Sequence, residues 1–205
     1  MYGGIIMSVL VAIKKNDKIY LGADSQATRG GVRTNFLEED GRKIRLLDNG
    51  IIIGAVGPKK GGKLIFAHPE FFTLTDDGEL TKKHVALNIV PLINKCLEEN
   101  DLITSEKNEP PTWMNVFFIA HRDKLFWLTK SETVVTVNHY VSAGAGDDVA
   151  FPGLMKLDSE DVTDDSEVYE RLVEILKVTE DRISSVSGPF FLIDTESKEF
   201  KMIKE

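Results

Sequence analysis

Two polar residues flank the first two predicted strands, and their types are those needed for nucleophilic catalysis. Ser8 precedes the apolar run at residues 9–13, and Asp24 follows the run at 19–21. A serine hydroxyl is a weak nucleophile unless a neighbouring base accepts its proton. If Ser8 were the first residue, its own α-amino group, with a pKa of about 7.7–8.0, would be partly neutral at neutral pH and would serve as that base. An unperturbed lysine, with a pKa of about 10.4, would supply far less neutral amine.

The residues before Ser8 decide whether this chemistry is available, because Ser8 carries a free amine only when nothing precedes it. One interpretation places the start of translation at Met7, since Gly3-Gly4 can be encoded by a sequence that resembles a bacterial ribosome-binding site. Methionine aminopeptidase removes Met before small residues, which would expose Ser8. The alternatives are a short propeptide cleaved between Met7 and Ser8, or a leader that stays attached and leaves the chain inert. We therefore interpret residues 1–7 as a leader or a mis-assigned start.

The apolar pattern predicts the elements that must position these residues. Residues 9–13 and 19–21 form a hairpin, and Asp48-Asn49-Gly50 is a strong turn signal because Asn-Gly tolerates positive φ. A helix is predicted at 82–99, with a kink at Pro91. The other predicted elements are strands at 43–47, 51–56, 113–120, 124–128, 133–137, 140–142, 190–194 and 199–203, and helices at 147–157 and 165–180. Tight turns between successive strands favour antiparallel sheets, so the sequence predicts an α+β fold in a single domain, residues 8–205.

Composition excludes several classes of function. The 205 residues carry a net charge of −8, and no cluster of Lys and Arg is interleaved with aromatic residues, so we expect no nucleic-acid partner. No apolar run approaches the roughly 20 residues that span a bilayer, so we expect no membrane partner. The single cysteine, Cys96, lies in a helical apolar pattern and is predicted to be a core residue, which fits a cytoplasmic protein. The histidines lack metal-ligand spacing, and we expect no metal or cofactor.

A resemblance to a known family becomes specific in two segments. Residues 8–28, with the acidic stretch Gly22-Ala23-Asp24, and residues 42–57 resemble the N-terminal part of proteasome β-type subunits and of the peptidase subunit of the bacterial two-component ATP-dependent protease. These proteins are N-terminal-nucleophile hydrolases. The resemblance implies a four-layer αββα sandwich, in which two antiparallel sheets stack and helices cover both outer faces.

The same resemblance assigns roles to individual residues. Ser8 falls on the nucleophile, Lys43 on the catalytic lysine, and Asp24 on the carboxylate that holds this lysine and balances its charge. Gly54 matches the glycine whose backbone N–H helps to form the oxyanion hole, and Ser187 matches the serine of a serine-glycine pair near the site. Without the resemblance, Lys43 and Asp24 would be interpreted as a surface ion pair, which is common and contributes little.

Two positions depart from the family pattern. Ala145 stands where active members usually have a serine close to the terminal amine, and Ser184 stands where they usually have an aspartate. We expect a proteasome-like N-terminal-serine peptidase that hydrolyses peptide bonds through an acyl-enzyme. The alternatives are a catalytically inactive ring subunit, which the two departures favour, and a small-molecule amidase of the same fold. The family implies a peptide or unfolded-protein substrate, a homo-oligomeric ring and an ATP-dependent unfoldase as partner.

A second motif, at residues 57–64, nearly matches the phosphate-binding pattern G-x-x-x-x-G-K-[ST]. Leu64 occupies the position of the hydroxyl that binds Mg²⁺, and Pro58 removes one N–H from the phosphate cradle. We therefore do not expect nucleotide binding here.

Overall fold

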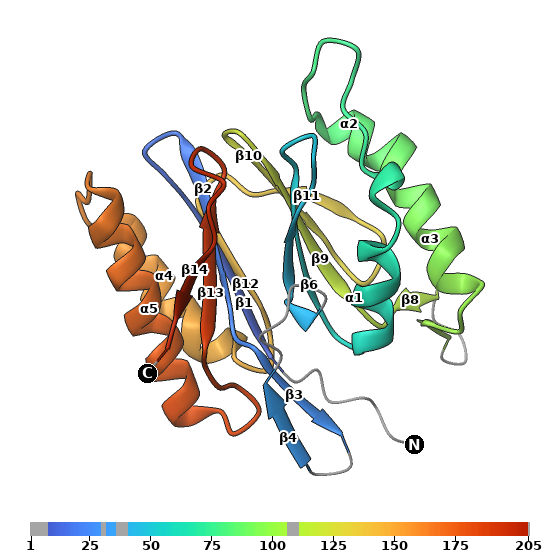
Figure 1. Ribbon diagram of the computed structural model, residues 1–205. Helices are drawn as coiled ribbons and strands as arrows, with labels where there is room; N and C mark the ends of the chain where they lie inside the picture. The colour runs from blue at the N-terminus through green and yellow to red at the C-terminus, as the bar shows by residue number, and fades with distance from the viewer. Residues whose placement is uncertain (1–7, 30–31, 36–40, 106–110, 205) are drawn as a thin grey trace.

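The computed structural model describes residues 8–29, 32–35, 41–105 and 111–204, and Figure 1 shows two facing sheets with helices on their outer sides. The first sheet contains, in order, β12 (Tyr140–Gly144), β1 (Val9–Lys15), β2 (Lys18–Ala23), β13 (Phe190–Asp194) and β14 (Lys201–Ile203). The second sheet contains β11 (Val134–Thr136), β10 (Lys124–Leu128), β9 (Val116–His121), β6 (Ile52–Val56) and β5 (Ile44–Leu46). Neighbouring strands in both sheets are antiparallel, as predicted.

The central strands are buried on both faces, which is why they appear as nearly continuous apolar runs. In β1, Leu10 and Ala12 pack between the two sheets, whereas Val9 and Val11 pack against the helices on the outer face. Since side chains alternate along a strand, one run of apolar residues serves two separate cores. The inter-sheet core also takes side chains from the second sheet, among them Phe118 of β9.

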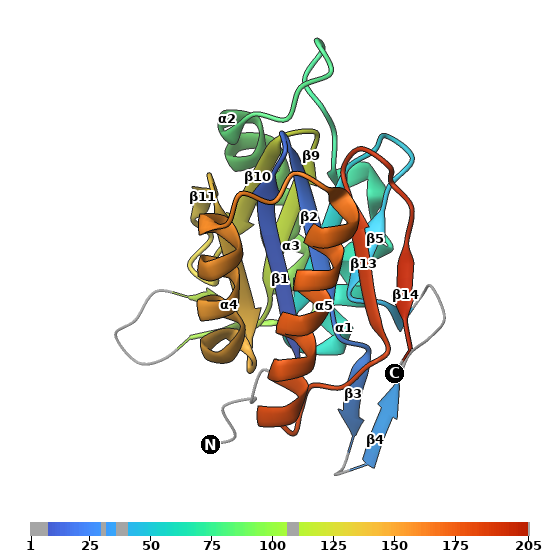
Figure 2. The ribbon, with the colours of Figure 1, turned by 90° about the vertical axis from the view of Figure 1, so that its left-hand side faces the viewer.

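Helices cover the outer face of each sheet. Helices α4 (Asp147–Ser159) and α5 (Asp165–Arg182) pack on the first sheet, side by side in Figure 2. Helices α1 (Lys59–Phe66) and α3 (Val90–Glu98) pack on the second sheet. The resulting order of layers is helices, sheet, sheet, helices (Figure 1), which is the sandwich expected from the sequence.

Turn chemistry sets the registers of the two hairpins that carry the candidate site. The β1–β2 turn has Asn16 and Asp17 at φ of 52° and 59°, both in the left-handed region that a two-residue hairpin turn requires. The β5–β6 turn has Gly50 at φ of 82°, within the predicted Asp48-Asn49-Gly50 signal. Both predicted hairpins are therefore confirmed.

The predicted helix at 82–99 is present but is not uniform. It consists of α2 (Lys82–His84), a π-helical segment (Val85–Ile89) and α3. Pro91 has no N–H to donate to the preceding turn, and its ring displaces the carbonyl that would have accepted it. The wider π-helical turn immediately before Pro91 accommodates this displacement.

Several short elements were not predicted from the sequence. They are helix α1, the 3₁₀ turn Pro69–Phe71, and the two small sheets formed by β3 (Gln26–Arg29) with β4 (Val32–Asn35) and by β7 (Ile103–Thr104) with β8 (Thr112–Trp113). Cys96 is buried in the core beneath α3, as predicted. Among the described residues, no helix is long and apolar enough to cross a membrane.

Candidate active site

Asp24 is the centre of the site. It directly follows β2, and its side chain has no solvent exposure. Its Oδ1 accepts hydrogen bonds from Lys43 Nζ at 2.6 Å and from the Val9 backbone N–H at 2.9 Å, and its Oδ2 accepts one from the Gln26 N–H at 3.1 Å. Burial raises the pKa of Asp24, and the Lys43 ammonium and the two backbone donors oppose that rise.

Lys43 approaches Asp24 from the other sheet. It immediately precedes β5, and its carbonyl accepts the Ala55 N–H at 2.8 Å, which fixes its backbone to β6. Its ammonium also donates to the Gln26 carbonyl at 2.8 Å, and its side chain is 15% exposed. Burial lowers the pKa of Lys43 because it penalises the charged form, and the neighbouring Asp24 carboxylate opposes this effect. Lys43 and Asp24 are therefore a largely buried pair rather than a surface ion pair.

Hydrogen bonds hold Ser8 in place through the peptide unit that joins it to Val9. Its carbonyl accepts the Gly146 N–H at 3.2 Å, and the next N–H, that of Val9, donates to Asp24 at 2.9 Å. Gly144, at φ of +106°, lies so close that an added Cβ would be 2.3 Å from the Ser8 carbonyl oxygen. Ser8 itself is 5% exposed. Both sides of the Ser8–Val9 peptide unit are thus fixed by the first sheet and its loops.

One carboxylate oxygen connects these parts. Asp24 Oδ1 binds both the lysine and the N–H of the residue after Ser8, so the predicted nucleophile and the predicted lysine are held by the same atom. Within the described part of the chain, no hydrogen bond joins the Ser8 side chain to Lys43 or Asp24. The fold therefore gathers Ser8, Asp24 and Lys43 at one end of the sandwich, where β1 begins, β2 ends and β5 begins.

The loop before β13 lies beside this cluster. The Ser187 carbonyl accepts the Ser25 N–H at 3.2 Å, and the Ser187 hydroxyl donates to Asn35 Oδ1 at 3.3 Å. Ser184 is exposed, and its carbonyl accepts the Gln26 side-chain amide at 3.3 Å. The backbone of this loop therefore supports the segment after Asp24, while the described contact of the Ser187 hydroxyl is with Asn35 of β4.

Ala145, one of the two departures from the family pattern, is in the loop after β12. It lies between Gly144 and Gly146, the two residues whose backbones contact the Ser8 carbonyl. Its methyl group offers no hydrogen-bonding atom next to the Ser8 main chain.

Gly54 does not lie where an oxyanion donor is needed. It is in the middle of β6, paired with Ile44 and Phe118, and an added Cβ would be 2.7 Å from Leu10 Cδ2 in the inter-sheet core. Because the Ala55 N–H points toward β5, the adjacent Gly54 N–H points toward β9, within the sheet. The prediction for Gly54 is therefore corrected: this glycine serves the close packing of the two sheets.

Gly57, a second glycine that the sequence analysis did not connect with the site, lies at the end of the same strand. It follows the last residue of β6 at φ of +120° and is separated from α1 by Pro58. Its N–H points to the same side as that of Ala55, beyond the start of β5, and donates to no acceptor in the described residues. The available signal was the Gly57-Pro58 break between an apolar strand and the lysine-rich segment.

Asn115 explains the glycines that resembled a phosphate-binding loop. Its amide donates to the carbonyls of Val56 at 3.2 Å and Pro58 at 3.0 Å, on either side of Gly57. An added Cβ at Gly61 would lie 1.9 Å from Asn115 Oδ1. Glycine at 57 and 61 is therefore required by the close approach of Asn115 to the turn between β6 and α1.

Comparison with known proteins adds the fold. No protein-family model and no curated protein matches the chain. Among solved structures, BPH from Thiobacillus denitrificans in complex with epoxomicin superposes with a TM-score of 0.68 at 16% identity, covering 91% of this chain and 97% of that chain. The Anbu complex from Pseudomonas aeruginosa, described as a helical assembly, gives 0.72 at 13% identity, with coverage of 96% and 87%. HslV from Trypanosoma brucei gives 0.60 at 14% identity, with coverage of 91% and 98%.

These similarities extend over most of the length of this chain and of each solved structure. At such identities they establish the fold alone, and it is the proteasome-type fold of N-terminal-nucleophile hydrolases that the resemblance implied.

Proposed function

We propose that this protein is a proteasome-like peptidase whose nucleophile is Ser8, exposed as the N-terminal residue. The observation that carries the proposal is the shared carboxylate oxygen: Asp24 Oδ1 binds Lys43 Nζ at 2.6 Å and the Val9 N–H at 2.9 Å. If Asp24 and Lys43 were only a surface ion pair, neither the full burial of the Asp24 carboxylate nor its hydrogen bond from the Val9 N–H would be needed. The arrangement instead connects a lysine, through one carboxylate oxygen, to the peptide unit that follows the proposed nucleophile, and this supports the proposal.

The two hydrogen bonds that hold the Ser8–Val9 peptide unit do not depend on the residues before Ser8. Its carbonyl and the following N–H are both held by residues of the folded domain. Moreover, Ser8 has a φ of 127°, a conformation that residues other than glycine rarely adopt. A first residue has no φ, so removal of residues 1–7 would remove the unfavourable φ of Ser8 and leave both hydrogen bonds in place.

In the proposed mechanism, the free α-amino group of Ser8 accepts the hydroxyl proton as Oγ attacks the carbonyl carbon of the scissile peptide bond. Lys43, poised by Asp24, stabilises the developing negative charge and lowers the pKa of the hydroxyl. The C–N bond then breaks, and the amine leaves with the proton that the α-amino group took from Ser8. Water, deprotonated by the same amine, cleaves the Ser8 ester, releases the carboxylic acid and restores the hydroxyl.

The oxyanion donor in this mechanism is the Gly57 N–H. Leu10 contacts Gly54 across the two sheets, Ser8 is two residues before Leu10, and Gly57 is three residues after Gly54. The start of β1 and the end of β6 both lie toward the end of the sandwich from which β3 and β4 project (Figure 1). A backbone N–H with no acceptor at the end of a strand is the kind of donor that an oxyanion requires.

The assembly and the partners belong to the same proposal. One structure with this fold is described as a helical assembly and another as a complex with epoxomicin. We propose that this chain likewise works as an oligomer, ring-shaped as the sequence resemblance implies, with peptides or unfolded proteins as substrates. An ATP-dependent unfoldase would deliver folded proteins to such a site.

A second candidate function is a subunit without catalytic activity, and two positions favour it. Ala145 provides no hydroxyl beside the Ser8 main chain, and Ser184 provides no carboxylate in the loop that supports Gln26. In that case, the buried pair of Asp24 and Lys43 would serve only to hold the two sheets together.

The deciding experiment combines intact mass with an epoxyketone probe. Protein expressed from its natural gene is weighed, treated with epoxomicin and weighed again, with Ser8→Ala as the control. The peptidase proposal expects a chain that begins at Ser8 and gains one probe molecule, because the epoxyketone reacts with both the terminal amine and the hydroxyl. A chain that begins at Ser8 but gains no mass supports the inactive subunit, and a chain that retains residues before Ser8 rules out the N-terminal nucleophile.

A further inference from the structure

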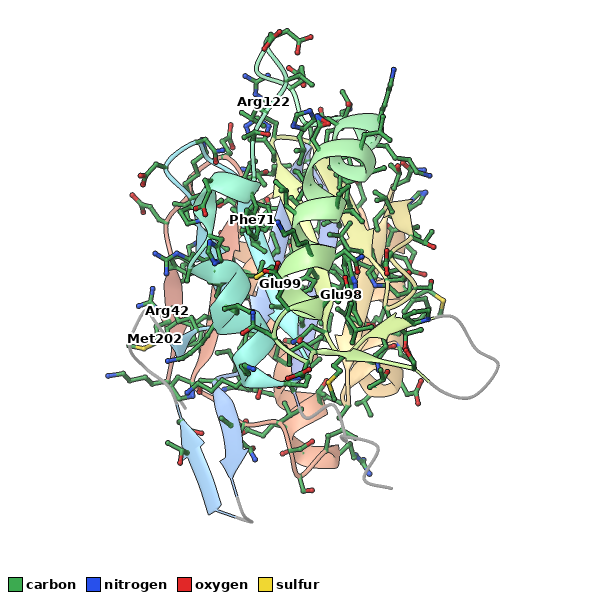
Figure 3. All side chains as sticks on the ribbon, turned by 90° about the vertical axis from the view of Figure 1, so that its right-hand side faces the viewer. Arg42, Phe71, Glu98, Glu99, Arg122 and Met202 are labelled. Atoms are coloured by element: carbon green, nitrogen blue, oxygen red, sulfur yellow. The ribbon has the colours of Figure 1, made fainter. Side chains whose placement is uncertain are left out.

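Arg42, which precedes Lys43 in the chain, makes a contact of its own with the first sheet and the residue before its last strand. Its guanidinium lies over two aromatic rings of the other sheet, 4.7 Å from the centre of Phe191 and 4.9 Å from that of Phe200. Figure 3 shows Arg42 beside Met202, the residue of β14 that pairs with Phe191. Phe191 is 1% exposed, so the stack is built on a rigid part of the core.

The two consecutive residues Arg42 and Lys43 both cross from the second sheet to the first. Lys43 reaches Asp24 at the end of β2, whereas Arg42 reaches β13 and the residue before β14. Phe191 is paired with Ala23, the immediate neighbour of Asp24. The surface that receives Arg42 and the carboxylate that receives Lys43 are therefore parts of one rigid unit.

The chemistry of the contact is specific to arginine. The guanidinium is planar and stacks on aromatic faces, which the compact ammonium of lysine does less well. Arg42 Nε is buried without a hydrogen-bond partner in the described residues, so this nitrogen does not anchor the side chain. The rings provide the anchor on this side.

We propose that Arg42 is a positioning residue: its contact with the rings of Phe191 and Phe200 holds the Lys43 amine against Asp24 and keeps that amine out of water. Its effect on catalysis rests on the proposed function, whereas its effect on Lys43 does not. Asp24, directly after β2, is the charged group that faces the Lys43 amine in the described structure. Loss of the Arg42 anchor would let Lys43 move toward solvent and weaken its contact with this carboxylate.

The experiment compares four variants and one control variant with the unaltered protein. Arg42→Met keeps an apolar side chain without the planar cation, and Arg42→Lys keeps the charge without the stack. Phe200→Leu removes the more exposed ring, and its combination with Arg42→Met completes a double-mutant cycle. Lys201→Met is the matched control, because Lys201 Nζ lies 3.7 Å from the centre of the Tyr169 ring and this contact involves neither Arg42 nor Lys43.

Two readouts are needed, of which the first does not depend on catalysis. The titration of Lys43 is followed by NMR of 13Cε-labelled lysine, with the Lys43 signal identified by its absence in Lys43→Arg. The pKa of Lys43 rises in Arg42→Met, because the amine becomes more hydrated. Arg42→Lys gives a smaller rise, and Lys201→Met gives none.

The second readout is the rate of epoxomicin adduct formation across pH, corrected for the folded fraction. Arg42→Met misplaces the lysine and thereby lowers the rate at neutral pH about tenfold. The acidic limb of the pH profile reports protonation of the base, the Ser8 α-amino group, and it moves to higher pH because the positive charge of Lys43 is then farther from that amine. Phe200→Leu lowers the rate less, and adding it to Arg42→Met has little further effect because the shared contact is already lost.

The possible outcomes separate the two proposals. If the unaltered protein forms no adduct but the Lys43 pKa rises in Arg42→Met, positioning by Arg42 is supported and the peptidase proposal fails. If the unaltered protein forms the adduct while Arg42→Met changes neither the Lys43 pKa nor the rate, positioning by Arg42 is overturned. A loss of thermal stability with both readouts unchanged overturns it as well, because it would reveal a purely structural stack.

Discussion

Replacing Asp24 with asparagine tests the centre of the site most directly. The change keeps the size of the side chain but removes its charge, which is fully buried. The Lys43 side chain is only 15% exposed, and of the two acceptors described for its ammonium, Asp24 and the Gln26 carbonyl, only the carbonyl remains. An asparagine also presents an NH₂ group where Asp24 accepted the backbone donors of Val9 or Gln26.

The expected cost follows from these contacts. Removing one partner of a buried ion pair typically costs about 3–5 kcal/mol, because the other charge stays buried without compensation. A mispaired backbone donor adds about 1–3 kcal/mol. Since the stability of a folded domain is about 5–15 kcal/mol, Asp24→Asn should be strongly destabilised at pH 7, yet within measurable range.

The pH dependence of this loss has a definite sign. Burial already lowers the pKa of Lys43, and the variant lacks the carboxylate that opposes the effect, so the pKa falls further. Between that lowered value and the ordinary pKa of about 10.4, the unfolded chain binds more protons at this residue than the folded chain. The free energy of unfolding therefore rises with pH in this window, by up to about 1.4 kcal/mol for each pH unit, so the variant regains stability as Lys43 becomes neutral.

The measurement is urea denaturation of Asp24→Asn and the unaltered protein between pH 7 and pH 10. Asp194→Asn is the matched control, because Asp194 is 2% exposed and accepts hydrogen bonds from Tyr169 and two backbone N–H groups, but no ion pair involves it in the described structure. The control should lose stability without regaining it at high pH. The reasoning would be refuted by an Asp24→Asn variant as stable as the original protein, or by a deficit that is the same at pH 7 and pH 10.

Three further predictions concern the residues around Ser8. Ala145→Ser should raise the rate of epoxomicin adduct formation about fivefold, the effect of one added hydrogen bond to the Ser8 amine, and an unchanged rate would show that Ala145 is not next to that amine. Gly57→Ala should abolish the adduct and lower the free energy of unfolding by about 1–3 kcal/mol, because it adds a Cβ at positive φ only 2.7 Å from the Met114 carbonyl oxygen. Gly54→Ala should cost about as much stability by overpacking Leu10 but leave the rate of the folded fraction nearly unchanged, and the reverse pattern would restore the oxyanion role to Gly54.

The sequence predicted the two hairpins that carry the site because their signals are local. The runs at 9–13 and 19–21, and the Asp48-Asn49-Gly50 turn, express strand and turn preferences of adjacent residues. The β3–β4 pair and α1 were not predicted, since β3 and β4 lack an alternating apolar pattern and α1 begins with four glycines and lysines at 59–62. The assignment of Gly54 was wrong for a related reason: a G-x-x-G spacing identifies two glycines but not which one ends the strand.

By itself, the sequence determined the strand order along the chain, the antiparallel hairpins and the types of residue available for catalysis. The tertiary structure decided which of these residues meet. Ser8, Asp24 and Lys43 lie at the ends of three strands of two sheets. The contact of one carboxylate oxygen with both Lys43 and the residue after Ser8 forms only because the two sheets pack on a shared core. The same packing buries the pair, which turns an ordinary lysine and aspartate into groups with shifted pKa values. Local preferences act between neighbours in sequence, whereas desolvation and contact across the sandwich depend on the complete fold.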